Sequence, residues 1–65
     1  MSLGHKVKER RRALGLRQEE LAELAGVSMS FVNFVEHEKP SIQLDKLLQV
    51  LKVLGLELDV RVGKQ

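Results

Sequence analysis

The sequence predicts an all-α domain of four short helices followed by one C-terminal β-strand. In four segments apolar residues recur at helical spacing, and glycines or a proline separate these segments. Residues 56–62 instead alternate strictly between apolar and charged residues, which is the period of a half-buried strand. A chain of 65 residues has room for one small domain only. We expect the helical domain at residues 1–55 and the strand with its tail at residues 56–65.

The composition leaves association with a second copy as the source of extra stability. A single core of this size rarely supplies more than ~3–5 kcal/mol. The chain has no cysteine, so neither a disulfide nor a thiolate zinc site can contribute. Its two histidines, His5 and His37, are too few for a structural metal site. We therefore expect a homodimer without a metal or cofactor.

Other features argue against an enzyme and against a membrane protein. The chain lacks cysteine and tyrosine, and the adjacent Glu19 and Glu20 diverge by ~100° on a helix, so they cannot share a substrate. Their simpler role is favourable charge near a helix N-terminus. No apolar run reaches the ~18–20 residues of a membrane span, and the N-terminus lacks the apolar core of a signal peptide. We expect a cytoplasmic protein that is not an enzyme.

The charges are unevenly distributed along the chain, although the net charge is only +2. The first segment is basic and the middle of the chain is acidic. A basic front beside an acidic flank can orient a protein on a phosphate backbone, and the alternative is a solvated charged helix. The basic residues of the front are Lys6, Lys8, Arg10, Arg11, Arg12 and Arg17.

The first helix is expected at about Leu3–Leu14. Arginine, lysine and glutamate are strong helix formers and sustain this segment, and Gly15 ends it. We expect a thin apolar stripe to face the core, made of Leu3, Val7, Ala13 and Leu14.

Two short helices joined by a tight turn follow, at about Gln18–Ala25 and Met29–Glu36. Gly26 suits a helix C-cap with positive φ, and the hydroxyl of Ser28 can cap the next helix. The expected buried residues are Leu21, Ala22, Leu24 and Ala25 in the first of these helices, and Val32 and Val35 in the second. Two helices joined by such a glycine-containing turn indicate a helix-turn-helix, whose second helix enters the major groove of DNA.

The face of residues 29–36 that turns away from the core is expected to meet double-stranded DNA. Ser30 and Asn33 can hydrogen-bond base edges, and asparagine suits a bidentate contact with adenine. Phosphate contacts would position this helix without carrying sequence information. The outward residues are Ser28, Met29, Ser30, Asn33 and Phe34, and the expected phosphate contacts are Arg17, Gln18, Ser28 and Lys39.

A fourth helix is expected from Gln43 or Leu44 to Leu54, because Pro40 ends the preceding helix and Gly55 caps this one. Its apolar face is broader than three short helices need, so part of the face is expected to meet a second subunit. The residues of this face are Leu44, Leu47, Leu48, Leu51 and Leu54, widened by Val50 and Val53.

The predicted strand needs a partner, because a lone strand leaves its backbone N–H and C=O groups unpaired. The nearest partner is the same strand of a second copy, antiparallel about a two-fold axis. Its dimerisation residues would be Leu56, Leu58, Val60 and Val62. The alternative is a frayed tail.

The segment from about Lys6 to Leu54 resembles the Xre/Cro family, the relatives of lambdoid phage repressors. This resemblance implies a lambda-repressor-like helix-turn-helix domain that represses transcription by binding an operator. The residues that carry it are Gln18, Leu21, Ala22, Gly26, Val27, Val32, Val35 and Glu36.

The run HEKPSIQLDKLL followed by GLELDVRV resembles a narrower branch, the HipB-like antitoxins. That branch has four helices and one C-terminal strand, and it partners HipA-type Ser/Thr kinase toxins. The resemblance therefore implies an antitoxin that also represses its own operon. The alternative is a stand-alone Xre-family regulator without a toxin partner.

The Xre/Cro resemblance also assigns roles to individual residues. It implies that Gln18 holds a phosphate and braces the recognition helix. It implies a buried ion pair between Arg11 and Glu36 that joins the first and third helices. The residues that align with base contacts are Met29, Ser30, Asn33 and Phe34.

Four positions differ from the usual family pattern. Arg17 stands where a threonine cap is usual, which removes a cap and offers a phosphate contact instead. Glu38 stands where glycine usually follows the third helix, so we expect that turn to differ in shape. Met29 and Phe34 are less polar than typical base readers and suit thymine methyl groups. For Phe34 the alternative is packing in the dimer interface.

Overall fold

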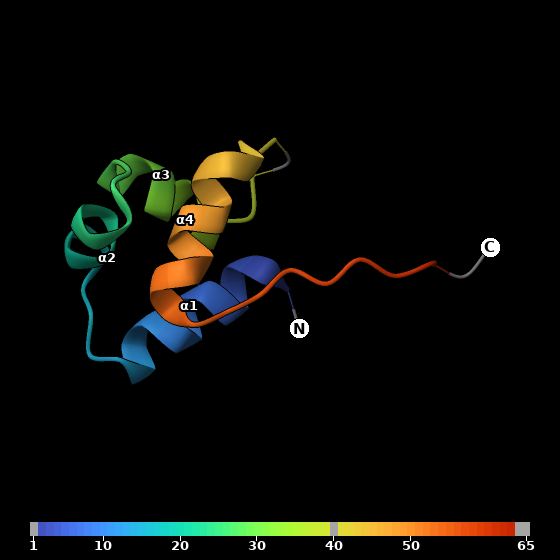
Figure 1. The fold of residues 1–65 in the computed structure, drawn as a ribbon. Helices are drawn as coiled ribbons and strands as arrows, with labels where there is room; N and C mark the ends of the chain where they lie inside the picture. The colour runs from blue at the N-terminus through green and yellow to red at the C-terminus, as the bar shows by residue number, and fades with distance from the viewer. Residues whose placement is uncertain (1, 40, 64–65) are drawn as a thin grey trace.

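The computed structural model describes residues 2–39 and 41–63 and has four helices in this part of the chain. The all-α prediction is confirmed, and the helices begin and end as predicted except that the first ends one residue earlier. The prediction that Pro40 stops the third helix lies outside the described residues. The helices are α1 Leu3–Ala13, α2 Gln18–Ala25, α3 Met29–Glu36 and α4 Leu44–Leu54 (Figure 1).

Every helix ends in the same left-handed turn. Gly15, Gly26 and Gly55 take φ values of 72°, 72° and 70°, which glycine adopts without strain. Glu38 takes φ 54° at the corresponding position after α3. Its N–H donates to the Val35 carbonyl at 3.0 Å, as in the glycine-ended turns. The turn after α3 therefore keeps the ordinary shape, contrary to expectation, and a glutamate bears the strain.

The helix starts follow local capping chemistry. Ser28 accepts a hydrogen bond from the Phe31 N–H at 3.0 Å at the start of α3. Arg17, before α2, has no acceptor group and cannot do the same. Instead the Glu20 carboxylate reaches back and accepts from the Arg17 backbone N–H at 2.8 Å. This is the reciprocal half of a capping box, and it offsets part of the lost cap.

All four helices contribute to one apolar core. The two valines of α3 are completely buried in it, and Arg10 closes the bundle by donating from Nε to the Leu54 carbonyl at 2.8 Å. This bond satisfies one of the unpaired carbonyls at the end of α4. The core residues are Val7, Leu21, Ala22, Ala25, Val32, Val35, Leu47, Val50, Leu51 and Leu54.

Several predicted core residues are exposed instead. The inward face of α1 is formed by Gly4, Val7 and Arg11, because this is the side on which α3 and α4 pack. Gly4 is buried because α1 passes close to the end of α3. On α2, Leu24 points away from the core and is 63% exposed. The other wrongly assigned residues are Ala13 and Leu14, whereas exposed Leu44 and Leu48 belong to the part of α4 expected to meet a second subunit.

The C-terminal segment 56–63 is extended and runs away from the helices (Figure 1). No strand is formed in this segment, in which Val60 and Val62 are 94% and 95% exposed. A strand exists only as part of a ladder, and within residues 2–39 and 41–63 this segment has no neighbouring strand to pair with. Strand formation and pairing across a dimer therefore stay predictions. Residues 64 and 65 of the predicted tail lie outside the described residues.

Candidate nucleic-acid interface

Helix α3 is held to the core by one face and leaves the opposite face to solvent. Val32 and Val35 are fully buried, while Ser30 and Asn33 are exposed. Helix α2 packs on α3, and its buried residues include Ala22 and Ala25, whose small side chains allow neighbouring helices to approach closely. The short turn through Gly26 then fixes the angle between them. The exposed face of α3 is thus presented on a rigid support.

All the predicted base-facing residues lie on this exposed side. Met29 and Phe34 are large apolar residues that remain in contact with solvent, on either side of Ser30 and Asn33. Exposed apolar groups beside polar ones suit the mixed surface of base edges and thymine methyl groups. Ser28, just before the helix, is also exposed, and its hydroxyl serves as the N-cap.

The predicted phosphate contacts fall into two groups. Arg17 and Lys39 are exposed and flank the helix pair in sequence on opposite sides. Gln18 is only half-exposed, and its Nε2 donates to the Glu36 carboxylate at 3.1 Å. In this structure the Gln18 amide therefore links the start of α2 to the end of α3.

Arg11 and Glu36 form an ion pair between α1 and α3, at the positions assigned by resemblance. The Arg11 Nε lies 2.7 Å from one carboxylate oxygen and Nη2 lies 3.1 Å from the other, so the contact is bidentate. A third donor of Arg11, Nη1, bonds the Leu16 carbonyl at 2.8 Å. Together with Gln18, this network ties both ends of the helix-turn-helix to α1.

The pair is nearly closed to solvent. The side chains of Arg11 and Glu36 are 10% and 2% exposed. Burial raises the pKa of Glu36, but hydrogen bonds from Arg11 and Gln18 and the positive charges of Arg11 and Lys8 lower it by more. The net pKa of Glu36 lies below its ordinary value, so the carboxylate is charged at neutral pH.

A groove beside α3 contains residues that the sequence reasoning missed. It lies between the exposed side of α3 and the start of α4. Lys46 brings a positive charge to it from the first turn of α4, and Ser41 and Gln43 bring polar groups from the preceding loop. The sequence signal for Lys46 was its place in the first turn of the helix that follows the recognition helix. The groove is lined by Ser28, Ser30, Phe31, Phe34, Ser41, Gln43 and Lys46.

Metal-ligand clusters and membrane-spanning helices are both absent from the part of the chain that the structure describes. Within residues 2–39 and 41–63, no three side chains among His, Asp and Glu lie together as a metal would require. In the same residues no helix is both long and apolar enough to cross a bilayer.

A helix pair joined by a tight turn, with one helix presenting a polar outer face, defines a helix-turn-helix module. The chain belongs to the helix-turn-helix family HTH_3, whose model matches residues 7–60. Curated relatives of this chain are named as regulators of transcription, which connects the module with gene regulation.

Two curated relatives illustrate this similarity. The HTH-type transcriptional regulator y4mF of Sinorhizobium fredii is 43% identical over 58 residues, covering 89% of this chain and 76% of y4mF. The HTH-type transcriptional regulator PuuR of Escherichia coli is 38% identical over 55 residues, covering 85% of this chain. The chain spans only 30% of the length of PuuR.

Two solved structures share the fold. One is a chain of the HipA-HipB-O2-O3 complex, and the other is called MDT Protein. Each superimposes with a TM-score of 0.81 at 24% identity, covering 95% of this chain and 87% of the other. At this level of identity the likeness establishes the fold alone.

Proposed function

We propose that this chain is a sequence-specific DNA-binding repressor whose helix α3 lies in the major groove. The observation that carries the proposal is the division of α3 into two faces. Val32 and Val35 anchor one face in the core, and Ser30 and Asn33 stand on the exposed face. Base readers held on a rigid support suit recognition, because sequence is read only when the side chains keep their register.

The residues divide into base readers and phosphate holders. Direct readout is assigned to Asn33 and Ser30 through hydrogen bonds, and to Met29 and Phe34 through thymine methyl groups. The exposed groove beside α3 supports a base-facing Phe34 over packing in a dimer interface. The phosphate contacts are Arg17, Gln18, Ser28 and Lys39, joined by Lys46 at the end of that groove.

We further propose that the repressor binds as a homodimer in the cytoplasm. A two-fold axis would place two α3 helices about 34 Å apart, one turn of the double helix. Leu44 and Leu48 on α4 are exposed apolar side chains that a second subunit would cover. The extended tail, through Leu56, Leu58, Val60 and Val62, would supply the strand that joins the subunits.

A more specific proposal is that the protein is the antitoxin of an autoregulated operon. The fold similarity to a chain of the HipA-HipB-O2-O3 complex favours this reading. The partner would then be a HipA-type Ser/Thr kinase. The alternative is a stand-alone Xre-family regulator, which the absence of an adjacent reading frame encoding a kinase would favour.

The test of DNA binding is a gel shift with the DNA upstream of the protein's own gene. We expect a discrete complex with this DNA that random DNA of equal length does not displace. Asn33→Ala should weaken this preference, and Glu23→Ala, on the exposed side of α2, is the matched control. Equal binding of both DNAs by the unmodified chain would overturn the proposal of sequence-specific repression.

The antitoxin proposal has a separate test. Where a kinase is encoded beside the gene, it is co-expressed with a tagged copy of this chain, and the purified material is assayed for a stable complex. A complex that relieves growth arrest by the kinase supports the antitoxin. Growth arrest that this chain leaves unchanged would favour the stand-alone regulator.

A further inference from the structure

We propose that the tail pairs with the tail of a second copy in one antiparallel register, centred on Val60. This inference rests on the proposed homodimer and adds which residues face each other across its two-fold axis. Asp59 would lie opposite the partner's Arg61, and Leu58 would lie opposite the partner's Val62.

The alternation of the tail restricts the possible registers. In an antiparallel pair, directly opposite residues point to the same face. When the two-fold axis passes through a residue, each apolar residue lies opposite an apolar residue of the partner. A slip of one residue would place every apolar residue opposite a charged one, because side chains alternate between the two faces of a strand. The axis must then pass through one residue between 56 and 62.

The charges select among these registers. A centre at Leu58 places Glu57 opposite Asp59, and a centre at Glu57, Asp59 or Arg61 places that residue opposite its own copy. Like charges directly opposite are destabilising. A centre at Leu56 or Val62 pairs too few residues of the segment to form a ladder.

Only the centre at Val60 joins opposite charges without opposing like ones within residues 56–63. It makes two symmetric contacts between Asp59 and Arg61. In the single chain, Arg61 Nε lies 2.6 Å from the Asp59 carboxylate, so both side chains already lie on one face. Pairing would exchange this contact within each chain for two symmetric contacts between the chains.

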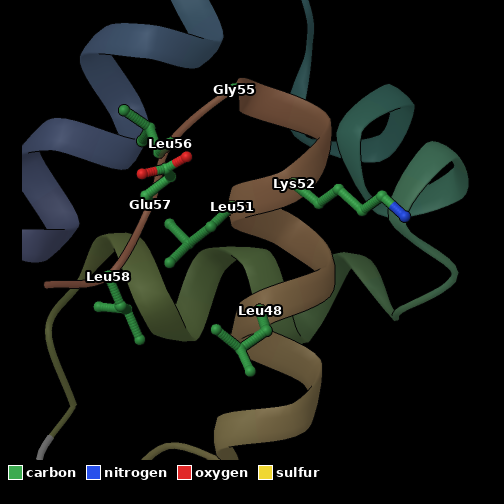
Figure 2. Close-up of a pocket in the computed structure, with 7 residues that line it drawn as sticks. All are labelled: Leu48, Leu51, Lys52, Gly55, Leu56, Glu57 and Leu58. Carbon is green, nitrogen blue, oxygen red and sulfur yellow. The ribbon is translucent and has the colours of Figure 1, made fainter.

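The apolar face of the tail fits the same arrangement. Leu56 and Leu58 border a groove on α4, and Figure 2 shows Leu48 and Leu51 pointing from α4 toward the tail. Leu48 and Leu58 are each 46% exposed, so one chain leaves the groove incompletely covered. With Val60 at the centre, the partner's Val62 lies beside Leu58 and extends the apolar cover of this groove. The same contact buries a valine that is almost fully exposed in one chain.

Single cysteines test the register directly, because the chain has none of its own. Three variants are oxidised with glutathione and resolved on non-reducing gels: Val60→Cys, Asp59→Cys and Leu58→Cys. Only Val60→Cys brings two thiols directly opposite each other, where the separation allows a disulfide. We expect a covalent dimer from Val60→Cys and no covalent dimer from the other two variants.

Charge exchange provides an independent readout. Asp59→Arg or Arg61→Asp alone would place two like-charged pairs across the axis and raise the dimer Kd about tenfold. The double variant Asp59→Arg with Arg61→Asp restores both pairs and should return the Kd to near its original value. Sedimentation equilibrium measures these constants, and the exposed tail lies outside the core, so the fold is kept.

The outcomes separate the register from the proposed repressor. A disulfide through residue 58 or 59, or a double variant as weak as the single ones, would overturn the centre at Val60. A chain that sediments only as a monomer would overturn the pairing altogether. The gel shift with upstream DNA reports separately on repression, so DNA binding by a chain with another register leaves the repressor proposal standing.

Discussion

The guanidinium of Arg11 holds the carboxylate of Glu36 in a bidentate contact, with Nε 2.7 Å from Oε2. The pair joins α1 to the last residue of α3, and Gln18 adds a donor from the first residue of α2. The candidate recognition helix α3 and the two helices that position it, α1 and α2, therefore meet at one carboxylate. This makes Glu36 a sensitive point for stability and for the orientation of α3.

Removing the Glu36 carboxylate should strongly destabilise the fold. Glu36→Ala leaves the buried Arg11 without its counter-charge, and breaking a buried pair in this way costs about 3–5 kcal/mol. Urea denaturation followed by circular dichroism measures the loss. The control is Glu23→Ala, an exposed glutamate on α2, which should change the free energy of unfolding by no more than ~0.5 kcal/mol. An unchanged urea midpoint for Glu36→Ala would show that the pair adds no stability.

The same carboxylate should make stability depend on acid pH. The pKa of Glu36 is lower in the folded state, so its contribution is complete above the unfolded value of about 4.3 and is lost as pH falls through the folded pKa. The pKa of Glu20 is also lowered in the folded state, chiefly because the Arg17 backbone N–H donates a hydrogen bond to its carboxylate. The difference between the wild type and Glu36→Gln isolates Glu36. We expect this difference in unfolding free energy to shrink below pH 4, and a constant difference would contradict the assignment.

Gly4→Ala should destabilise the protein although alanine is the better helix former. An added Cβ would lie 2.7 Å from the carbonyl oxygens of Val35 and Glu36, so α1 and α3 would have to move apart. We expect a loss of about 1–3 kcal/mol, as for other overpacked sites. His5→Ala, at an exposed position of the same helix, is the control. A gain in melting temperature for Gly4→Ala would mean that the close approach of the two helices is easily relaxed.

Asn33→Ala should reduce discrimination between operator and random DNA by about 1–3 kcal/mol. The amide is an exposed polar group in the middle of α3 and contributes no charge, so the slope of affinity against salt should stay nearly constant. Fluorescence anisotropy with both DNAs across a salt series provides the measurement. An equal loss for both DNAs would indicate that Asn33 contacts only the DNA backbone.

Arg17→Ala and Lys46→Ala should behave in the opposite way. If each residue contacts a phosphate, each substitution should weaken operator and random DNA alike and reduce the salt slope by about one. Lys52→Ala, on the last turn of α4, removes an equal charge away from the groove beside α3 and serves as the control. A salt slope that Lys46→Ala leaves unchanged would remove Lys46 from the interface and leave the role of Arg17 intact.

Local chemistry explains why the helices could be predicted from the sequence. Gly26 and Ser28 carry their capping preferences wherever they occur, so the turn between α2 and α3 follows from a few adjacent residues. The buried valines of α3 follow from helical spacing for the same reason. The exposed face of α3, with its candidate base readers, could be predicted once those valines were assigned to the core.

Only the tertiary structure determined which apolar residues stay exposed and which distant residues come together, because both depend on how the helices cross. Leu24 and Leu48 lie at the edges of apolar stripes, and only the position of neighbouring helices determines that these edges stay exposed. Gly4 lies against the end of α3, although the two are far apart in sequence. Lys46 of α4 lines the groove beside α3. The sequence determined the alternation of the tail, but a strand also requires a neighbour. In the part of the chain that the structure describes, no second strand lies beside this segment.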